Sequence, residues 1–109
     1  MRDAEFKAFI EDQLDGLRGL VCRSMFGGYG LYQGRTFFGI IFRGQLYFKT
    51  RDETRRRYEQ AGMKPFRPSA KQTLKNYYEV PADVVENPEE LVAWAQEAVR
   101  ATAKAGRLI

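Results

Sequence analysis

The amino-acid sequence predicts an α+β fold: a two-layer domain in which about five strands form an antiparallel-dominated sheet, with N- and C-terminal helices packed mainly on one face. Three observations predict it: helical apolar spacing at both ends of the chain, alternating apolar runs between them, and glycine-rich turns that separate these runs. With 109 residues, of which 44% are hydrophobic, the chain has the size and composition of one domain. We therefore expect residues 1–109 to form a single domain with one core.

The chain begins with an amphipathic helix predicted over residues 3–17. Its apolar residues follow the spacing of one helical face: Phe6, Phe9, Ile10, Leu14 and Leu17. Strands over residues 20–26 and 29–33 follow. Gly27, Gly28 and Gly30 lie at their junction, and no Gly-Lys-Ser/Thr or helix comes after them. A structural turn or bulge is therefore favoured over a phosphate cradle, with ligand binding as the minor alternative.

The next predicted strand, over residues 36–42, is apolar at both alternating sets of positions. Strict alternation places Phe38, Ile40 and Phe42 on one face and Phe37 and Ile41 on the other. We expect this strand to be central and covered on both faces. A tight turn after residue 42 then leads into a strand over residues 45–49 and forms a hairpin.

A short second helix begins at Thr50 or Asp52, either of which can cap it, and ends before Gly62 at the C′ position. Residues 55–57 are three consecutive arginines inside this helix. Because acidic residues precede them and long cationic side chains reach easily into water, we interpret this run as a solvated helix face.

Residues 63–72 contain two prolines and little periodicity, so we predict an irregular connection pinned by Phe66. Alternation returns over residues 73–80 and predicts a strand with Leu74, Tyr78 and Val80 on its drier side. The last helix has a clear start. Asn87 is the expected N-cap, Pro88 the first helical residue, and two glutamates follow, where they complement the helix dipole.

Composition narrows the function classes. The chain has no histidine, so the usual general base near neutral pH and every histidine-dependent triad or metal site are excluded. The single cysteine, Cys22, lies among apolar residues and is interpreted as a small core residue. Paired carboxylates at helix starts are interpreted as capping groups. We therefore expect no catalytic residue, no metal and no cofactor.

The net charge of +4 is mild and permits acidic partners without demanding them. No secretory signal is recognisable and no apolar run is long enough to span a bilayer, so we expect a cytoplasmic protein that binds no membrane.

The most suggestive constellation consists of Tyr47, Lys49, Lys75 and Tyr77. Alternation places these side chains on the non-core sides of their strands, and if the strands are neighbours the four form one aromatic, basic patch. Such a patch suits a tyrosine-rich protein interface or single-stranded nucleic acid, and an ordinary solvated or covered sheet face is the third interpretation. Arg23, in an apolar strand before the glycines, is interpreted as a structural clamp on their turn, with ligand binding as the alternative.

The segment Arg23-Ser24-Met25-Phe26-Gly27-Gly28-Tyr29-Gly30-Leu31-Tyr32 resembles the opening motif of the TfoX N-terminal domain family. Further segments resemble the family in the same order: residues 46–50, 62–66, 76–81 and 91–98. The resemblance covers roughly residues 10–105 and is specific.

This resemblance implies the N-terminal module of TfoX/Sxy-type competence regulators, which act as coactivators beside a cyclic-AMP-responsive transcription factor and have no known catalytic site. Longer members carry a C-terminal domain similar to helix-hairpin-helix modules, and we expect this chain to be a stand-alone N-terminal module without it. The expected function is a non-catalytic regulatory or adaptor domain in transcription or competence regulation. Its expected partner is a protein, such as a component of the transcription machinery or a second copy. Weak nucleic-acid binding by the basic, aromatic sheet face is the alternative.

Overall fold

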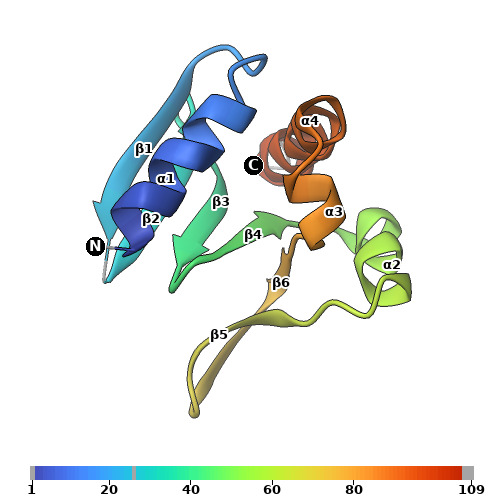
Figure 1. The fold of residues 1–109 in the computed structure, drawn as a ribbon. Coiled ribbons are helices and arrows are strands. Elements are labelled where there is room, and N and C mark those ends of the chain that lie inside the picture. Colours follow the sequence, from blue (N-terminus) through green and yellow to red (C-terminus); the bar gives the residue numbers. More distant parts are fainter. Residues whose placement is uncertain (1, 26, 107–109) are drawn as a thin grey trace.

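The computed structural model describes residues 2–25 and 27–106, with side chains for residues 3–25 and 27–102. The elements follow in the order α1 (Arg2–Gln13), β1 (Leu20–Met25), β2 (Gly28–Gln33), β3 (Thr36–Phe42), β4 (Gln45–Lys49), α2 (Asp52–Gln60), β5 (Pro65–Ser69), β6 (Gln72–Glu79), α3 (Ala82–Val85) and α4 (Pro88–Gly106). Figure 1 shows α1 lying along β1 and β2 at one end of the sheet, α4 beside it over the central strands, and α3 and α2 beyond α4.

The strands form one six-stranded sheet in the order β1-β2-β3-β4-β6-β5, and every neighbouring pair is antiparallel. The predicted α+β class with an antiparallel sheet and terminal helices is confirmed. The central position of β3 is confirmed as well, since two strands lie on one side of it and three on the other.

The strand that the sequence did not predict is β5, where an irregular connection was expected. It lies at the sheet edge and pairs only with β6 in the sheet order. Pro65 and Pro68 have no backbone N–H to donate, which an edge strand tolerates because one of its sides faces no partner. Figure 1 shows the β5–β6 hairpin extending away from the other strands. The expectation of an irregular segment was therefore wrong, although Phe66 is fully buried.

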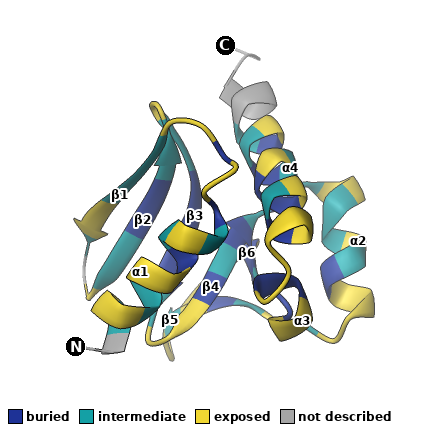
Figure 2. Ribbon diagram, turned by 45° about the horizontal axis from the view of Figure 1, so that its top comes forward, coloured by how far each residue is buried: buried dark blue, intermediate teal, exposed yellow. Residues whose placement is uncertain are grey.

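One face of the sheet carries the main core and all the helices that contribute to it. Sheet residues such as Phe38, Ile41 and Phe48 pack there with Ile10 and Leu14 near α1, Tyr58 of α2, Val84 and Val85 of α3, and Leu91 and Trp94 of α4. Figure 2 shows these inward positions as buried stripes along α4 and the central strands. The side chains of this core are nearly all fully removed from water, which is the main stabilising term of the fold.

A β-bulge in β3 changes which residues share a face. The register runs from Gly28 opposite Phe42 to Leu31 opposite Gly39, then shifts so that Tyr32 lies opposite Phe37, which leaves Phe38 as the extra residue. Phe38 therefore joins Ile41 on the helix side, whereas Phe37, Ile40 and Phe42 lie on the opposite face. The strict alternation predicted for this strand was wrong because a bulge inverts the alternation beyond it.

Gly39, the residue after the bulge, has no room for a side chain. A Cβ there would lie 3.1 Å from a ring carbon of Phe48, 3.1 Å from the carbonyl oxygen of Tyr47 and 3.2 Å from a methyl group of Leu31. The glycine thus lets three strands pack closely around the position where the bulge inserts an additional phenylalanine.

The β3–β4 turn is held by the first helix. Arg43 and Gly44 have φ angles of 51° and 76°, the left-handed pair that a tight two-residue hairpin requires. The backbone N–H groups of both residues donate to the Asp3 carboxylate, at 3.1 and 2.7 Å. This contact fastens the N-terminal end of α1 to the end of the central hairpin.

Helix boundaries differ from the predictions at three places. The helix α1 ends at Gln13, four residues before the predicted end. The N-cap of α2 is Arg51, whose N–H donates to Thr54 Oγ1 at 3.0 Å, because Thr50 is buried and its hydroxyl donates to the carbonyl of Asn76. The short helix α3 was not predicted.

The start of α4 is confirmed: Asn87 precedes it and its Oδ1 accepts the N–H of Glu90 at 3.2 Å. Among the described residues, no helix is long and apolar enough to cross a membrane.

The three arginines of α2 have different roles. Arg55 donates to Thr50, Asp52 and Asn76, and Arg57 pairs with Glu97 while its guanidinium lies 4.0 Å from the ring centroid of Trp94. Arg56 is exposed. The interpretation of the run as a solvated face was therefore wrong for two of its members, because their side chains attach α2 to β6 and α4.

We predict that Gly28→Ala destabilises the protein by about 3 kcal/mol, the upper range for forcing atoms into a packed site. A Cβ at Gly28 would lie 2.2 Å from the carbonyl oxygen of Ile41, a backbone atom that cannot rotate away. Gly16→Ala is the matched control, because its Cβ would meet only a methyl group of Val92 at an ordinary 3.5 Å, and it should change stability by less than about 0.5 kcal/mol. Urea unfolding of both variants measures the difference, and equal midpoints would contradict the close approach of β2 and β3.

Candidate functional site

The sheet face opposite the helices carries a second, smaller cluster of apolar side chains. Ile40, Phe66 and Tyr77 are buried in it, and Phe37, Phe42, Tyr47 and Leu74 pack around them. All these residues belong to strands, so in the described part of the chain no helix contributes to this cluster. We call its rings, together with Tyr32, the aromatic sheet face: Tyr32, Phe37, Phe42, Tyr47, Phe66 and Tyr77.

The rings of the aromatic sheet face form two rows in which neighbouring rings contact each other. Centroid distances are 5.1 Å for Tyr32–Phe37 and 5.6 Å for Phe37–Tyr77 on one side, and 5.3 Å for Phe42–Phe66 and 4.6 Å for Tyr47–Phe66 on the other. Tilted and edge-on pairs at these distances are the favoured arrangements of aromatic rings. The hairpin formed by β5 and β6 thus closes the far side of the face with Phe66.

Three of the four residues of the predicted patch lie together. The strands β4 and β6 are neighbours, with Lys49 opposite Tyr77 and Tyr47 opposite Glu79. The Lys49 ammonium lies 5.2 Å from the centroid of the Tyr77 ring, within the range of a cation–π contact. Lys75 is exposed and lies beyond the last β4–β6 pair.

The two tyrosines are not equally accessible. Tyr77 is only 9% exposed, whereas Tyr47 and Lys49 are half-buried. Burial raises the pKa of the Tyr77 phenol to about 12. Burial also raises the pKa of Tyr47, with a smaller contribution from the Glu79 carboxylate, and burial raises the pKa of Glu79 itself. Tyr77 therefore stabilises the face from within, and Tyr47 presents part of its ring at the surface.

Cations border the face at two further positions. The Arg23 guanidinium lies 5.7 Å from the Tyr32 centroid, and that of Arg43 lies 5.1 Å from the Phe42 centroid. Arg23 is exposed, lies opposite Gly30 in the β1–β2 register and reaches over Tyr32 at the edge of the aromatic sheet face.

The glycine motif lies beside Arg23. Gly27 has a φ of 82° between β1 and β2, and a Cβ at Gly30 would lie 2.8 Å from Met25 Sδ and 3.0 Å from a ring carbon of Phe37. These are close-packing constraints at the end of a hairpin. Phe26 lies outside the described residues.

Cys22 is half-buried in β1. Burial, then a hydrogen bond with the Glu11 carboxylate, raises the pKa of its thiol to about 12, while Lys7 acts in the opposite direction. Since the thiolate is the nucleophile, this environment disfavours cysteine chemistry.

Sequence reasoning missed most of the face. Phe37 and Phe42 were assigned to opposite sides because the bulge was not foreseen, and Phe66 was placed in a loop. Of the basic hairpin, which we define as Lys64, Arg67, Lys71 and Lys75, all exposed, it identified only Lys75. A charge count along the chain would have found the others, because residues 61–78 contain these four cations and no Asp or Glu.

Comparison with known proteins gives two matches. The family described as the TfoX N-terminal domain matches residues 12–102. The protein named DNA transformation protein TfoX1, from Aliivibrio fischeri (strain ATCC 700601 / ES114), is 34% identical over 79 residues. That alignment covers 71% of this chain and 38% of the relative, so the match spans well under half of the relative's length.

We predict that Tyr77→Phe reduces the loss of stability between about pH 10 and pH 12. Because the folded state raises the pKa of Tyr77 above its unfolded value, its contribution is complete below the unfolded pKa and is lost as the pH rises through about 12. Phenylalanine keeps the ring and removes the titrating group. Urea unfolding across this range measures the effect, with pH 7 as the reference at which the proteins should differ by at most about 1 kcal/mol. If the stability of both proteins falls equally between about pH 10 and pH 12, the folded state does not raise the pKa of Tyr77 and the prediction is wrong.

Proposed function

The chain belongs to the TfoX N-terminal domain family, and from this premise we propose that it is a non-catalytic adaptor domain in the regulation of DNA transformation. The proposed activity is binding of another protein through the aromatic sheet face. The name of the A. fischeri relative supports the process, and the family match supports the type of domain.

The observation that carries the proposal is the helix-free sheet face with half-buried rings. Phe37, Phe42 and Tyr47 keep part of their surface in water, although each could be fully covered by a partner. Tyrosine and phenylalanine are enriched at protein interfaces because they bury a large area with few rotatable bonds. Two cations lie on rings of this face: Lys49 on Tyr77 and Arg43 on Phe42. Their charge favours a partner that presents carboxylates.

Catalysis is not part of the proposal. The sequence has no histidine, and the thiol of Cys22 is held protonated by its surroundings.

We predict that Arg43→Gln/Lys49→Gln weakens capture of the partner about fivefold, which corresponds to about 1 kcal/mol. The measurement is quantitative pull-down from the producing cell, comparing the variant with wild type. Arg18→Gln/Arg56→Gln is the matched control, since it removes the same charge from exposed residues outside the aromatic sheet face. Tyr47→Ala should add to the loss, and Tyr77→Ala is avoided because it would open a cavity beneath the face. If the two double variants capture the same proteins in the same amounts, the proposed site is wrong.

A second candidate function is single-stranded nucleic-acid binding by the same face together with the basic hairpin. The specific observation is the set of exposed cations on and around the β5–β6 hairpin, next to strands that carry the rings, an arrangement in which bases can stack on the rings while phosphates meet the cations. The arginines of α2 contribute less than the sequence indicated, because Arg55 and Arg57 are engaged within the fold.

For this second function we predict that Lys71→Gln/Lys75→Gln flattens the salt dependence of binding to a labelled oligothymidylate. The slope of log Kd against log salt should fall by about 0.7 for each lysine that contacts a phosphate. Fluorescence anisotropy over a salt series measures it, with Arg18→Gln/Arg56→Gln as control. If the wild-type protein does not bind the oligonucleotide at low ionic strength, the nucleic-acid function is ruled out. That result would not bear on the proposed protein interface.

A further inference from the structure

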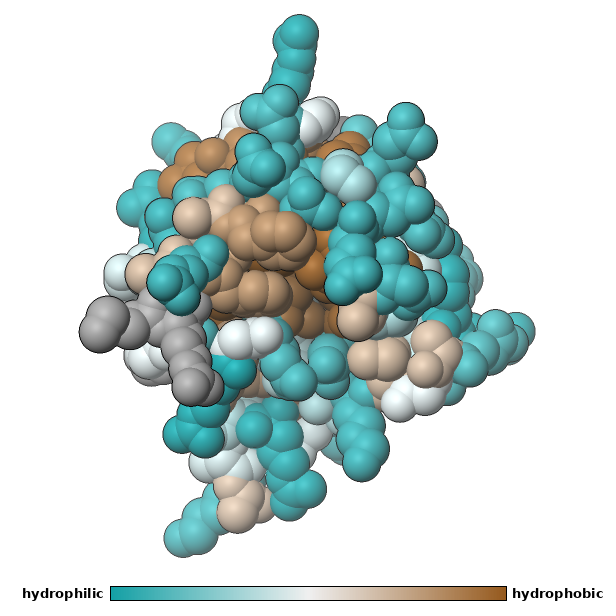
Figure 3. Space-filling view, viewed as in Figure 1, coloured by the Kyte–Doolittle hydropathy of each residue, from teal (hydrophilic) through white to brown (hydrophobic). Residues whose placement is uncertain are grey.

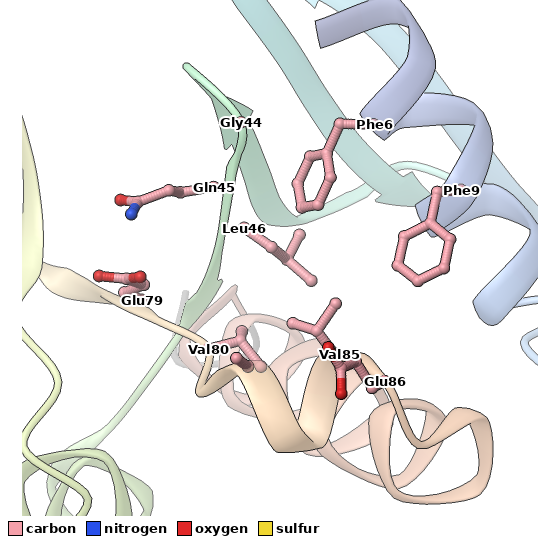
Figure 4. A pocket seen from close by; sticks show the side chains of 10 residues that line it. Phe6, Phe9, Gly44, Gln45, Leu46, Glu79, Val80, Val85 and Glu86 are labelled. Atoms are coloured by element: carbon pink, nitrogen blue, oxygen red, sulfur yellow. The ribbon is translucent and has the colours of Figure 1, made fainter. Parts of the chain in front are cut away.

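The helix layer on the other side of the sheet is incomplete. Between α1 and α3 there is a hollow of about 310 Å³ whose walls and floor include Phe6, Phe9, Leu46, Val80 and Val85. Figure 4 shows these side chains converging on the space from α1, from β4 and from both ends of α3, while Gln45 and Glu79 extend away from it. The floor is the sheet and the walls are helices, so the hollow lies where another helix would complete the layer.

This hollow is open to water. Phe9 is 41% exposed, which makes it the one large apolar side chain classed as exposed within residues 3–25 and 27–102. Figure 3 shows apolar atoms in a depression near the centre of this view, surrounded by hydrophilic side chains. An exposed aromatic ring at the mouth of an apolar depression marks a binding surface more often than an isolated surface residue does.

A second hollow continues the same boundary between α1 and α4. It has a volume of about 450 Å³ and is lined by Asp12, Gln13, Asp15, Gly16, Pro88, Glu89 and Val92. The two hollows adjoin at a hydrogen bond of 2.9 Å from Gln13 Nε2 to the carbonyl oxygen of Val85. We call the two hollows together the helical seam. Along α1 it extends from Phe6 to Gln13, seven residues further on or about 10 Å of helix, and it continues past the end of the helix to Gly16.

The charges of the helical seam are all of one sign. Five carboxylates line it, from Asp12, Asp15, Glu79, Glu86 and Glu89, and no Lys or Arg lines either hollow in the described part of the chain. Lys7 of α1 points elsewhere, since it bonds Glu11 and lies 5.5 Å from the centroid of Tyr29. Residues 76–99 contain six acidic residues and no basic one, in a protein whose net charge is +4.

We propose that the helical seam binds an amphipathic helix of a partner protein, whose apolar stripe enters the hollows and whose Lys and Arg side chains meet the carboxylates. A helix satisfies its own backbone hydrogen bonds and needs no strand edge, and among the described residues neither edge strand, β1 or β5, lines the hollows. The charge of the seam selects a basic helix over an acidic one.

A second copy of this chain fits the helical seam poorly. Two copies related by a two-fold axis would bring Glu86 and Glu89 of each against those of the other, which is repulsive. A second copy could also insert one of its own helices into the seam in a head-to-tail arrangement. Among the described helices, α1, α3 and the start of α4 carry acidic residues and would be repelled. The helix α2 carries arginines, but its Arg55 and Arg57 already bond residues within the same chain.

The test uses a fluorescein-labelled helical peptide of about 15 residues with leucine on one face and lysine on the other, and a counterpart in which glutamate replaces lysine. We expect the lysine peptide to bind wild type at physiological salt and the glutamate peptide not to bind. Phe9→Ser should weaken binding about tenfold, equivalent to about 1.4 kcal/mol. Because Phe9 is exposed, this variant should fold normally, which a thermal melt verifies.

Charge reversal supplies the matched control. Glu86→Lys/Glu89→Lys should abolish the preference for the lysine peptide, whereas Asp83→Lys/Glu90→Lys should preserve it. All four residues are exposed and belong to the same two helices or their ends, but Asp83 and Glu90 do not line the seam. Equal loss in the two variants would mean attraction to overall charge and would overturn the proposal.

Analytical sedimentation tests whether a second copy of this chain, rather than a partner helix, occupies the helical seam. A wild-type dimer that Phe9→Ser dissociates would assign the seam to a second copy and contradict the proposed partner helix. These variants leave the aromatic sheet face unchanged, so failure here and failure of the proposed function are separate results.

Discussion

The structure depends on one constraint: the central strand β3 is apolar on both faces, but the helices of the described residues cover only one of them. Phe38 and Ile41 find their cover in α1 and α4. On the opposite face Ile40 is buried by strand residues alone, chiefly through Phe66 and Tyr77. Burying this second apolar surface requires the β5–β6 hairpin and its rings, which explains why a strand with two prolines belongs to the sheet.

The same constraint gives the two faces different surfaces. On the face that aromatic rings cover, part of the ring surface stays exposed. The side chains of Arg43 and Lys49 stack on these rings. The helix layer buries its apolar residues more completely except at the helical seam, where carboxylates gather. The domain therefore presents a basic, aromatic side and an acidic, apolar side. Two surfaces of opposite charge suit a protein that holds two different partners at once.

The candidate site was predictable in part. Alternation correctly grouped Tyr47 with Lys49, and the pairing of β4 with β6, on which the prediction depended, brought them beside Tyr77. The two-residue period failed in β6, where Leu74 was predicted on the side of Tyr78 but lies on the face of Tyr77. The burial of Tyr77 could not be predicted from alternation. Tyr77 is covered by Phe37, which lies on this face because of the bulge in β3. A bulge depends on how a strand fits its neighbours, so periodicity within one strand does not reveal it.

The sequence by itself determined the α+β class, the central position of β3, the hairpin that follows it, the capped start of α4 and the family resemblance. These depend on local rules: helical spacing, strand runs, turn glycines and the Asn87 cap act over a few residues. Only the tertiary structure decided that β5 is a strand, that Arg57 stacks on Trp94 and that Phe9 opens onto a hollow. Each of these depends on residues distant in the chain, whose approach is set by packing and not by the local pattern.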